Sequence, residues 1–375
     1  MRVFMMSLLL AAGLAQAASP ITVQTLKYQG EKQAPSDEIT MPYVQAGSAD
    51  VTARINDSLY IGQFGMMAPR QPGRSLSAAD GIAVDGMPTQ SFSVIRNDGR
   101  VFSIQFDQEG CGAYCENYST YYSFDATTGR QLTMEDLFTP AGLRDLAKRM
   151  SKEQQMRYKN ELISLRKELK AQQKSHAGSK DDLDDLQARI ELNSQCAGEN
   201  AEPSDTPPAK VDPLESISYY KYVVLDKALT LSAGRCSNHA MRALDDVGDV
   251  DLTIPFTTLY RGMTPYGKTL LLNEGSAKAN GGIYGRLLRG YLGKSTAITM
   301  QLQHYSDNSV GGVYFYDKFR KPIRLSGLQT GQQLELTERV DDKDQTKATL
   351  HLTIDGERLR GRWEGDKQFD IQLAP

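Results

Sequence analysis

The 375-residue sequence has few of the residues that mark catalytic or metal sites. It contains one tryptophan and four histidines, and no two histidines stand in an H-x-x-x-H or H-E-x-x-H pair, the spacing with which hydrolases hold zinc. No G-x-S-x-G or Ser-x-x-Lys motif lies in a strand-turn-helix setting, where a serine nucleophile would be expected. We therefore predict no catalytic residues, no metal and no cofactor. The four isolated histidines are His176, His239, His304 and His351.

The only long apolar run stands at the N-terminus. Arg2 precedes the apolar segment Val3 to Leu14, and Ala15-Gln16-Ala17 follows in the small-x-small pattern of a signal peptidase site. We predict that residues 1 to 17 are a signal peptide. The run is too short for a bilayer span, which needs roughly 20 apolar residues, and no cysteine directly follows the cleavage site to accept a lipid. The expected product is a soluble periplasmic or secreted protein.

The sequence also has only a small excess of one charge over the other. Removing Arg2 from the 43 basic residues leaves 42 against 46 acidic residues, a net charge of about −4. A nucleic-acid surface needs a basic stripe, and the sequence suggests none, so nucleic acid is not an expected partner. The length indicates two domains.

Four cysteines occur in this exported chain, an even number that permits three disulfide connectivities. An oxidising compartment favours bridges. We favour Cys111 with Cys115, which closes a small turn, and Cys196 with Cys236, which clamps the ends of a polar excursion. Cys-x-x-x-Cys differs from the Cys-x-x-Cys of thiol oxidoreductases, so a redox role is not expected.

The first part of the chain predicts a strand-rich α+β domain at about residues 18 to 274. Its helix is expected at 50 to 61, where Val51, Ile55 and Leu59 recur every four residues. Asn97-Asp98-Gly99 predicts a tight hairpin turn between two strands. The expected strands lie at 21 to 28, 39 to 44, 90 to 96, 101 to 106, 119 to 124, 219 to 225, 229 to 232 and 250 to 256.

A helical hairpin is predicted as an insertion at about 150 to 215. A first helix opens at 140 to 150 and continues with helical spacing of apolar residues at 158 to 169. A second helix, with the same spacing at 183 to 190, follows the break His176-Ala-Gly-Ser. The segment 198 to 213 is rich in Glu, Pro, Ser and Asp, which predicts a solvated linker.

The C-terminal part, at about 280 to 375, predicts an all-β antiparallel barrel or sandwich. A Gly- and Ala-rich stretch from Asn273 to Gly285 marks the expected boundary. Seven short strands follow, separated by Gly, Asp and Asn turns, and such even spacing is typical of small barrels. They are expected to start near residues 296, 311, 323, 333, 347, 358 and 368.

Three further patterns were weighed as sites. Gly262 to Thr269 satisfies the phosphate-loop spacing, but too few residues follow for the helix that such a loop requires. The acidic clusters at 181 to 185, 245 to 251 and 341 to 344 lack the register of a calcium loop. Glu135 and Asp136 are adjacent on a turn, where carboxylates seldom acquire the separate pKa values of an acid-base pair.

The residues of the first domain resemble a known exported domain. They are Met41-Pro42-Tyr43, Ala53-Arg54-Ile55-Asn56, Val101 to Phe106, Tyr122-Ser-Phe-Asp125-x-x-Thr-Gly129-Arg-x-Leu-Thr-Met-Glu-Asp-Leu-Phe138, and Leu252-Thr-Ile-Pro255-Phe256-x-x-Leu259. Together they are similar to the extracytoplasmic domain of RsiV-type anti-sigma factors and to the domain that precedes the catalytic part of PdaC-type peptidoglycan deacetylases. The resemblance covers about residues 21 to 272, and the family is largely of unknown function.

This resemblance implies a non-enzymatic binding protein, because the anti-sigma factors of the family bind lysozyme. The expected partner is lysozyme or a peptidoglycan fragment. By analogy the contact region is the turn from Cys111 to Tyr118, with Tyr114 and Tyr118 as aromatic anchors and Glu116 between them. The chain departs from the family in its cysteine turn and its helical insertion, and it has no sigma-binding segment or deacetylase domain.

Two alternatives remain. The chain could be a cell-envelope hydrolase whose residues converge from distant segments, or a scaffold acting through its C-terminal domain. Four glycine and aromatic residues of that domain could form such a site, but they are more typical of a hydrophobic core. They are Gly312, Tyr314, Tyr316 and Trp363.

Overall fold

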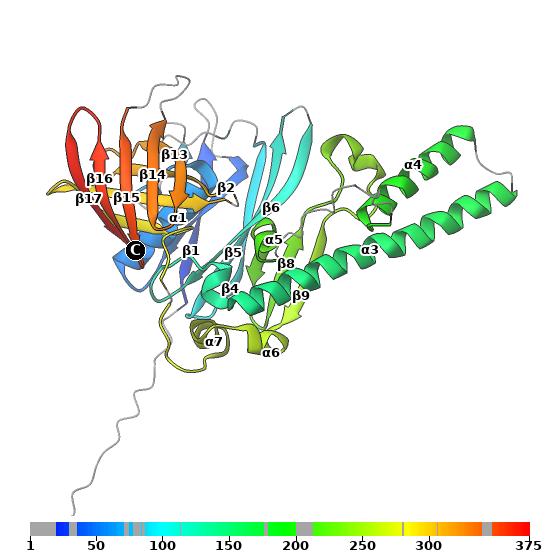
Figure 1. Ribbon diagram of the computed structural model, residues 1–375, viewed down its shortest axis with the longest axis horizontal. Coiled ribbons are helices and arrows are strands. Elements are labelled where there is room, and N and C mark those ends of the chain that lie inside the picture. Colours follow the sequence, from blue (N-terminus) through cyan, green and yellow to red (C-terminus); the bar gives the residue numbers. More distant parts are fainter. Residues whose placement is uncertain are drawn as a thin grey trace, which may run out of the picture.

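The computed structural model shows two sheets, a closed barrel and a projecting pair of helices (Figure 1). The predicted signal peptide and most of the predicted linker lie outside the residues that the structure describes. Within the described part, no helix is long and apolar enough to cross a membrane. The described residues are 20–29, 36–70, 75–77, 84, 87–112, 114–175, 179–199, 213–279, 281–305, 307–339 and 347–375.

A six-stranded sheet and one helix form the first layer. Helix α1 (Ala49–Phe64) begins at Ser48, whose hydroxyl accepts a hydrogen bond from the Val51 amide, and ends at Gly65 in the left-handed conformation. Its predicted stripe of Val51, Ile55 and Leu59 is buried against the sheet. The strand order is β3 (Leu76–Ser77), β1 (Thr22–Gln29), β2 (Ser36–Gln45), β4 (Thr89–Asn97), β5 (Val101–Cys111) and β6 (Cys115–Asp125).

The two faces of β5 are covered to different extents along the strand. Phe102, Ile104 and Phe106 are fully buried in the core beneath α1. On the opposite face Val101 packs into a second core near the Asn97-Asp98-Gly99 turn, whereas Asp107 is exposed. The end of the sheet that leads to the cysteine turn therefore presents a bare polar face.

A three-stranded antiparallel sheet and short helices form the second core. The strands are β7 (Lys221–Val224), β8 (Ala228–Ala233) and β9 (Val250–Pro255), paired in that order. The first turns of α3 (Pro140–Ser175) pack on them. The other helices of this part are α2 (Met134–Leu137), α5 (Pro213–Ser216), α6 (Phe256–Leu259), α7 (Pro265–Leu272) and the 3-10 turns η2 (Ile217–Tyr219), η3 (His239–Leu244) and η4 (Tyr260–Gly262).

The predicted helical hairpin is present, and its first helix continues from Pro140 past Leu169 as the spacing indicated. Residues 140 to 150 and 158 to 169 belong to one helix, α3, which pairs with α4 (Lys180–Cys196). The segment between them, Ser151 to Arg157, is made of good helix formers without Gly or Pro. Its one apolar residue, Met156, is exposed, because the segment lies between the core that contains Met150 and the core that contains Tyr158. Figure 1 shows the outer half of α3, with α4 beside it, projecting on the side away from the barrel.

The C-terminal part is a closed antiparallel barrel of eight strands rather than the seven that the sequence predicted. The missed strand is β10, which starts two residues after Gly285 and contains Gly290. A Cβ at Gly290 would collide with the Gln372 backbone, so this glycine permits the close pairing that joins β10 to the last strand. The barrel strands are β10 (Leu287–Leu292), β11 (Thr296–His304), β12 (Ser309–Tyr316), β13 (Pro322–Thr330), β14 (Gln333–Arg339), β15 (Thr349–Asp355), β16 (Arg358–Glu364) and β17 (Gln368–Ala374).

The barrel interior is filled by side chains. Tyr314 is 1% exposed and belongs to the barrel core, and Tyr316 and Trp363 pack against that core. Inside the barrel, the Tyr314 hydroxyl and the Trp363 indole N–H both donate to Oε1 of Glu338, at 2.5 and 2.6 Å. These residues therefore pack the barrel core, as the sequence indicated.

Helix α1 lies between the sheet and the barrel. Ile61 and Met67 pack against Leu287 and Phe315 of the barrel. Arg289 adds hydrogen bonds to Asp50 at 2.9 Å and to Asp57 at 3.2 Å. Burial is the main cause of the raised pKa of Asp57, and the nearby arginines oppose it.

Candidate binding groove beside the cysteine hairpin

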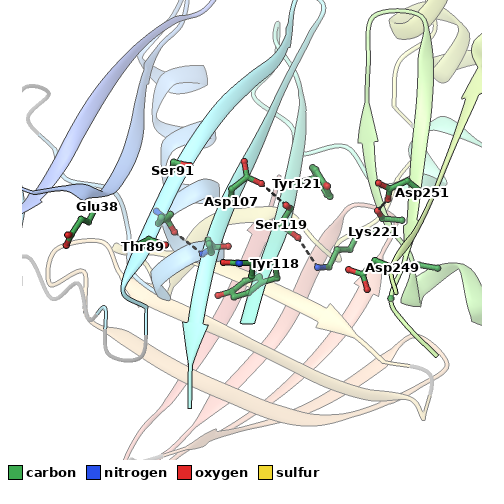
Figure 2. A pocket seen from close by; sticks show the side chains of 16 residues that line it. Glu38, Thr89, Ser91, Asp107, Tyr118, Ser119, Tyr121, Lys221, Asp249 and Asp251 are labelled. Carbon is green, nitrogen blue, oxygen red and sulfur yellow. Dashed lines mark hydrogen bonds between the residues drawn. The ribbon is translucent and has the colours of Figure 1, made fainter. Parts of the chain in front are cut away.

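An open polar groove lies where the bare face of the six-stranded sheet meets the three-stranded sheet. Its volume is about 600 Å³. Figure 2 shows side chains of both sheets facing the same space. We call it the acidic groove, and its lining consists of Glu38, Thr89, Gln90, Ser91, Asp107, Gln108, Asn117, Tyr118, Ser119, Tyr121, Lys221, Ser232, Ala233, Gly234, Asp249 and Asp251.

Two buried glutamines form the base of the groove. Gln108 donates to Oε1 of Gln90 at 2.9 Å and to Oε1 of Gln63 on α1 at 2.8 Å. Gln90 in turn donates to the Thr40 carbonyl at 2.9 Å. Because these amides bond each other and the backbone, they hold β2, β4 and β5 in register rather than offering themselves to a ligand.

The sheet wall is organised by Asp107 and Ser119, which pair across β5 and β6. The Ser119 hydroxyl and the Gln105 amide both donate to Oδ1 of Asp107 at 2.7 Å. Among the described residues no hydrogen bond reaches Oδ2 of Asp107. The Lys221 ammonium of β7 donates to the Ser119 carbonyl at 2.9 Å (Figure 2). One carboxylate oxygen of this wall thus remains available to a partner.

The opposite wall carries two carboxylates at the base of β9. Asp251 accepts a short hydrogen bond from the Ser232 hydroxyl, and Asp249 accepts one from the Arg235 amide at 2.9 Å. In both aspartates it is Oδ1 that accepts the hydrogen bond. Each carboxylate is oriented by the neighbouring strand or loop.

The groove has a strong excess of negative charge. Among the described residues, four carboxylates line it, from Glu38, Asp107, Asp249 and Asp251, against the single cation Lys221. Burial raises the pKa of Tyr121, and the charges of Asp251 and Asp107 act in the same direction, whereas its hydrogen bond with Ser119 opposes them. Tyr121 is therefore a neutral phenol between two acidic walls.

Of the three residues predicted as a binding site, Tyr118 lines this groove, and Tyr114 and Glu116 lie nearer the tip of the same hairpin. Tyr118 is 37% exposed and has the Lys221 ammonium 5.9 Å from its ring centroid. Tyr114, at the tip of the hairpin, is 71% exposed, and its ring centroid lies 5.2 Å from that of His239. Glu116 forms a short ion pair with Arg235 and lies 3.7 Å from Nδ1 of His239. Both tyrosines are accessible, whereas Glu116 already has intramolecular partners.

Both favoured disulfides are present, and they hold the two sides of this region. Cys111 and Cys115 face each other at the tip of the β5–β6 hairpin. Cys196 and Cys236 join the end of α4 to the loop that carries Arg235 and His239. The hairpin tip therefore packs against a loop that a second disulfide fixes.

The sequence patterns that were set aside as sites have structural roles. Thr264 caps α7, its hydroxyl accepting from the Gly267 amide at 2.9 Å, so the phosphate-loop match lies largely inside a helix. Asp245 accepts from the Tyr158 hydroxyl and the Gly248 amide, which orders its loop. In the described residues the only cluster with metal-ligand geometry is Glu109 with Cys111 and Cys115, whose sulfurs are oxidised in the disulfide. The cluster at 341 to 344 lies outside the described residues.

Sequence reasoning missed the acidic residues of the groove. Asp249 and Asp251 were noticed only as part of an acidic run, and Asp107 was not singled out. One signal was available, because polar residues alternate from Ser103 and Gln105 to Asp107 and Glu109, beyond the end of the strand predicted at 101 to 106. Nothing local indicated that β9 would stand opposite that face.

Comparisons with known proteins add little to this geometry. No protein-family model matches the chain, and no curated protein matches it. A solved structure of a DUF3298 family member from Bacteroides fragilis, a family of unknown function, is similar over 69% of this chain and 99% of its own. The identity is 9% and the TM-score 0.37, too low a similarity to support a functional argument.

Proposed function

We propose that this chain is a periplasmic, non-enzymatic binding protein whose acidic groove and cysteine hairpin hold a basic protein, with lysozyme as the leading candidate. The observation that supports it most directly is the charge of the groove, four carboxylates against one lysine, on an open surface with accessible tyrosines. Rigid tyrosines surrounded by Ser, Thr and Asn are also the composition of antibody binding surfaces. The signal-peptide pattern and the two disulfides support an extracytoplasmic location.

The arrangement suits binding better than catalysis. In the part of the groove that the structure describes, no histidine and no free thiol lines the walls. The carboxylates of Asp107 and Asp251 are held by serine hydroxyls of neighbouring strands. Fixed carboxylates on an open surface can receive lysine or arginine side chains of a partner without rearranging.

The first test is calorimetric titration of the oxidised protein with c-type and g-type lysozymes. We expect binding that weakens with salt, and the double variant Asp107→Asn/Asp251→Asn should lose roughly tenfold in affinity at low ionic strength, since rim charges contribute mainly through steering. The matched control, Asp181→Asn/Asp184→Asn, removes the same charge from exposed positions of α4 and should bind normally. Equal losses in both variants would show that net charge, and not this groove, governs the interaction.

Tyr114 provides a second test of the same surface. Truncating a central aromatic anchor commonly costs about 2 kcal/mol, so Tyr114→Ala should weaken binding of a confirmed partner roughly thirtyfold. Tyr291→Ala, which removes a 54% exposed tyrosine from the barrel, should leave the affinity unchanged. Unchanged affinity of Tyr114→Ala would remove the hairpin tip from the site.

A hydrolase of cell-wall polymers is the second candidate, because carboxylates from β5 and β9 line the two walls of one groove. Release of reducing sugars or muropeptides from purified peptidoglycan, abolished by Asp107→Asn, would establish it. Binding of soluble muropeptides without turnover would instead identify a cell-wall fragment as the ligand of a binding protein.

A further inference from the structure

The outer half of α3 carries a stripe of lysines that becomes visible only when the helix is continuous. Lys152, Lys159, Lys167, Lys170 and Lys174 are all exposed. Together with Met156 and Ile163 they follow the spacing 4, 3, 4, 4, 3, 4, which keeps them on one face of an α-helix. We call this face, from Lys152 to Lys174, the lysine stripe. It rises about 33 Å along the helix axis.

The stripe is the face of α3 opposite the one that packs on α4. Tyr158, Leu162 and Leu165 are buried against α4, and at 100° per residue they lie about half a turn from Ile163 and Lys167. The acidic residues of this half, Glu153, Glu161 and Glu168, lie outside the stripe by the same arithmetic. The charges are mixed in the sequence but segregated on the helix.

The lysine stripe has no carboxylate partner among the residues that the structure describes. Among the described residues, none of its five lysines forms an ion pair, whereas Arg157 and Arg166 beside them pair with Glu153 and Glu199. The sequence had suggested no basic stripe, and for α3 that prediction is wrong. Within the described part of the chain, the five ammonium groups are thus left to meet negative charge outside it.

Two apolar side chains stand among these lysines. Ile163 is 67% exposed and Met156 is 43% exposed. Lysine stems bordering exposed apolar residues are typical of helices that lie on membranes, with the ammonium groups at the phosphates and the apolar residues between the headgroups. A straight stripe of this length fits a flat surface better than the rounded surface of a globular protein.

A second copy of this chain does not suit the stripe. The complementary acidic residues, Asp181, Asp184 and Glu191, are exposed on α4, and helical spacing places them away from α3. Basic and acidic stripes on opposite flanks of one hairpin would join copies head to tail without closing into a dimer.

We infer that the lysine stripe docks the protein on membranes rich in anionic phospholipid, as a peripheral contact that is independent of the proposed binding groove. Each lysine held near an anionic leaflet contributes roughly a fivefold factor to membrane partitioning. The contact should therefore be strong at low salt and weaken steeply as salt is added.

The test is co-sedimentation of the purified chain, from residue 18 onward, with vesicles of phosphatidylcholine alone and of phosphatidylcholine with about one third phosphatidylglycerol. We expect binding only to the anionic vesicles. The variant Lys159→Glu/Lys167→Glu/Lys170→Glu should reduce it at least a hundredfold, because three attractive charges become repulsive. The matched control Lys294→Glu/Lys321→Glu/Lys367→Glu makes the same charge change at exposed barrel positions and should bind like the wild type.

A second measurement separates insertion from adsorption. The chain has one tryptophan, Trp363 in the barrel, so the emission that Ile163→Trp adds can be isolated by difference. It should shift to shorter wavelength with anionic vesicles and not with neutral ones. The inference is overturned if neither vesicle binds, if both triple variants lose binding equally, or if the stripe binds a soluble polyanion such as heparin but no vesicle.

Discussion

Replacing Asp136 with alanine is expected to lower the free energy of unfolding by about 3–5 kcal/mol, the usual effect of removing one partner from a buried ion pair. Asp136 is 1% exposed. Its Oδ1 lies 2.6 Å from the guanidinium of Arg286 and 3.1 Å from that of Arg130. Its Oδ2 accepts a hydrogen bond from the backbone amide of Thr133, the residue that caps the N-terminus of α2. Without this carboxylate two guanidinium groups would remain close together with little access to water.

The same network joins the first domain to the barrel. Arg286 precedes β10, and Arg130 also pairs with Glu357 at 2.7 Å in the β15–β16 turn. Burial lowers the pKa of Arg286, and Asp136 opposes that effect, so the carboxylate is what makes the buried cation tolerable.

Urea unfolding followed by far-ultraviolet circular dichroism and by Trp363 fluorescence measures the loss of stability in both parts. Asp184→Ala, an exposed control on α4, should stay within about 0.5 kcal/mol, and a similarly small change in Asp136→Ala would contradict the expected role.

Removing the Cys196–Cys236 bridge is expected to cost about 4 kcal/mol. The two cysteines are 40 residues apart, and chain entropy predicts this value for a loop of that size. The bridge closes the base of the helical arm, which is the projecting pair of helices α3 and α4. There the Tyr158 hydroxyl accepts a hydrogen bond from the Cys236 amide at 3.0 Å. The measurement is urea unfolding of Cys196→Ser/Cys236→Ser, followed at 222 nm, where the long helix α3 contributes strongly.

The second disulfide supplies the matched control. Cys111 and Cys115 are only 4 residues apart, so Cys111→Ser/Cys115→Ser should lose about 2 kcal/mol by the same entropy argument. Each double variant leaves no unpaired thiol. A hairpin variant that loses as much stability as the arm variant would show that loop length does not set the contribution of these bridges.

If both surfaces act as proposed, each binds a different kind of partner. The acidic groove faces a basic partner, and the lysine stripe on the projecting arm faces an anionic membrane. Opposite charge on separate surfaces prevents either one from binding the ligand of the other.

Much of the fold was predictable because its signals are local. The α+β class, the helical hairpin and the seven later barrel strands follow from side-chain periodicity and from Gly, Asp and Asn turns, which depend on neighbouring residues. Observed strand starts at Thr296, Gln333, Arg358 and Gln368 match the expected ones. The missed strand β10 contains Gly290, which allows close approach to β17. The residues next to Gly290 in the sequence do not indicate this contact.

The binding site was predictable only in part. The resemblance directed attention to Tyr114, Glu116 and Tyr118, of which Tyr118 lines the groove. It did not indicate that Glu116 pairs with Arg235, 119 residues later, or that Asp107 and Asp251 line the same groove. Contacts between segments so far apart depend on how the two sheets pack.

By itself, then, the sequence determined the secondary structure class, the barrel turns and the apolar leader pattern, because each rests on residue type and short-range spacing. The tertiary structure alone decided two things: the closure of the barrel by β10 and β17, and the acidic groove between two sheets. Each of these brings together groups whose energies depend on distance in space, and a linear sequence specifies that distance only through the complete packing of the chain.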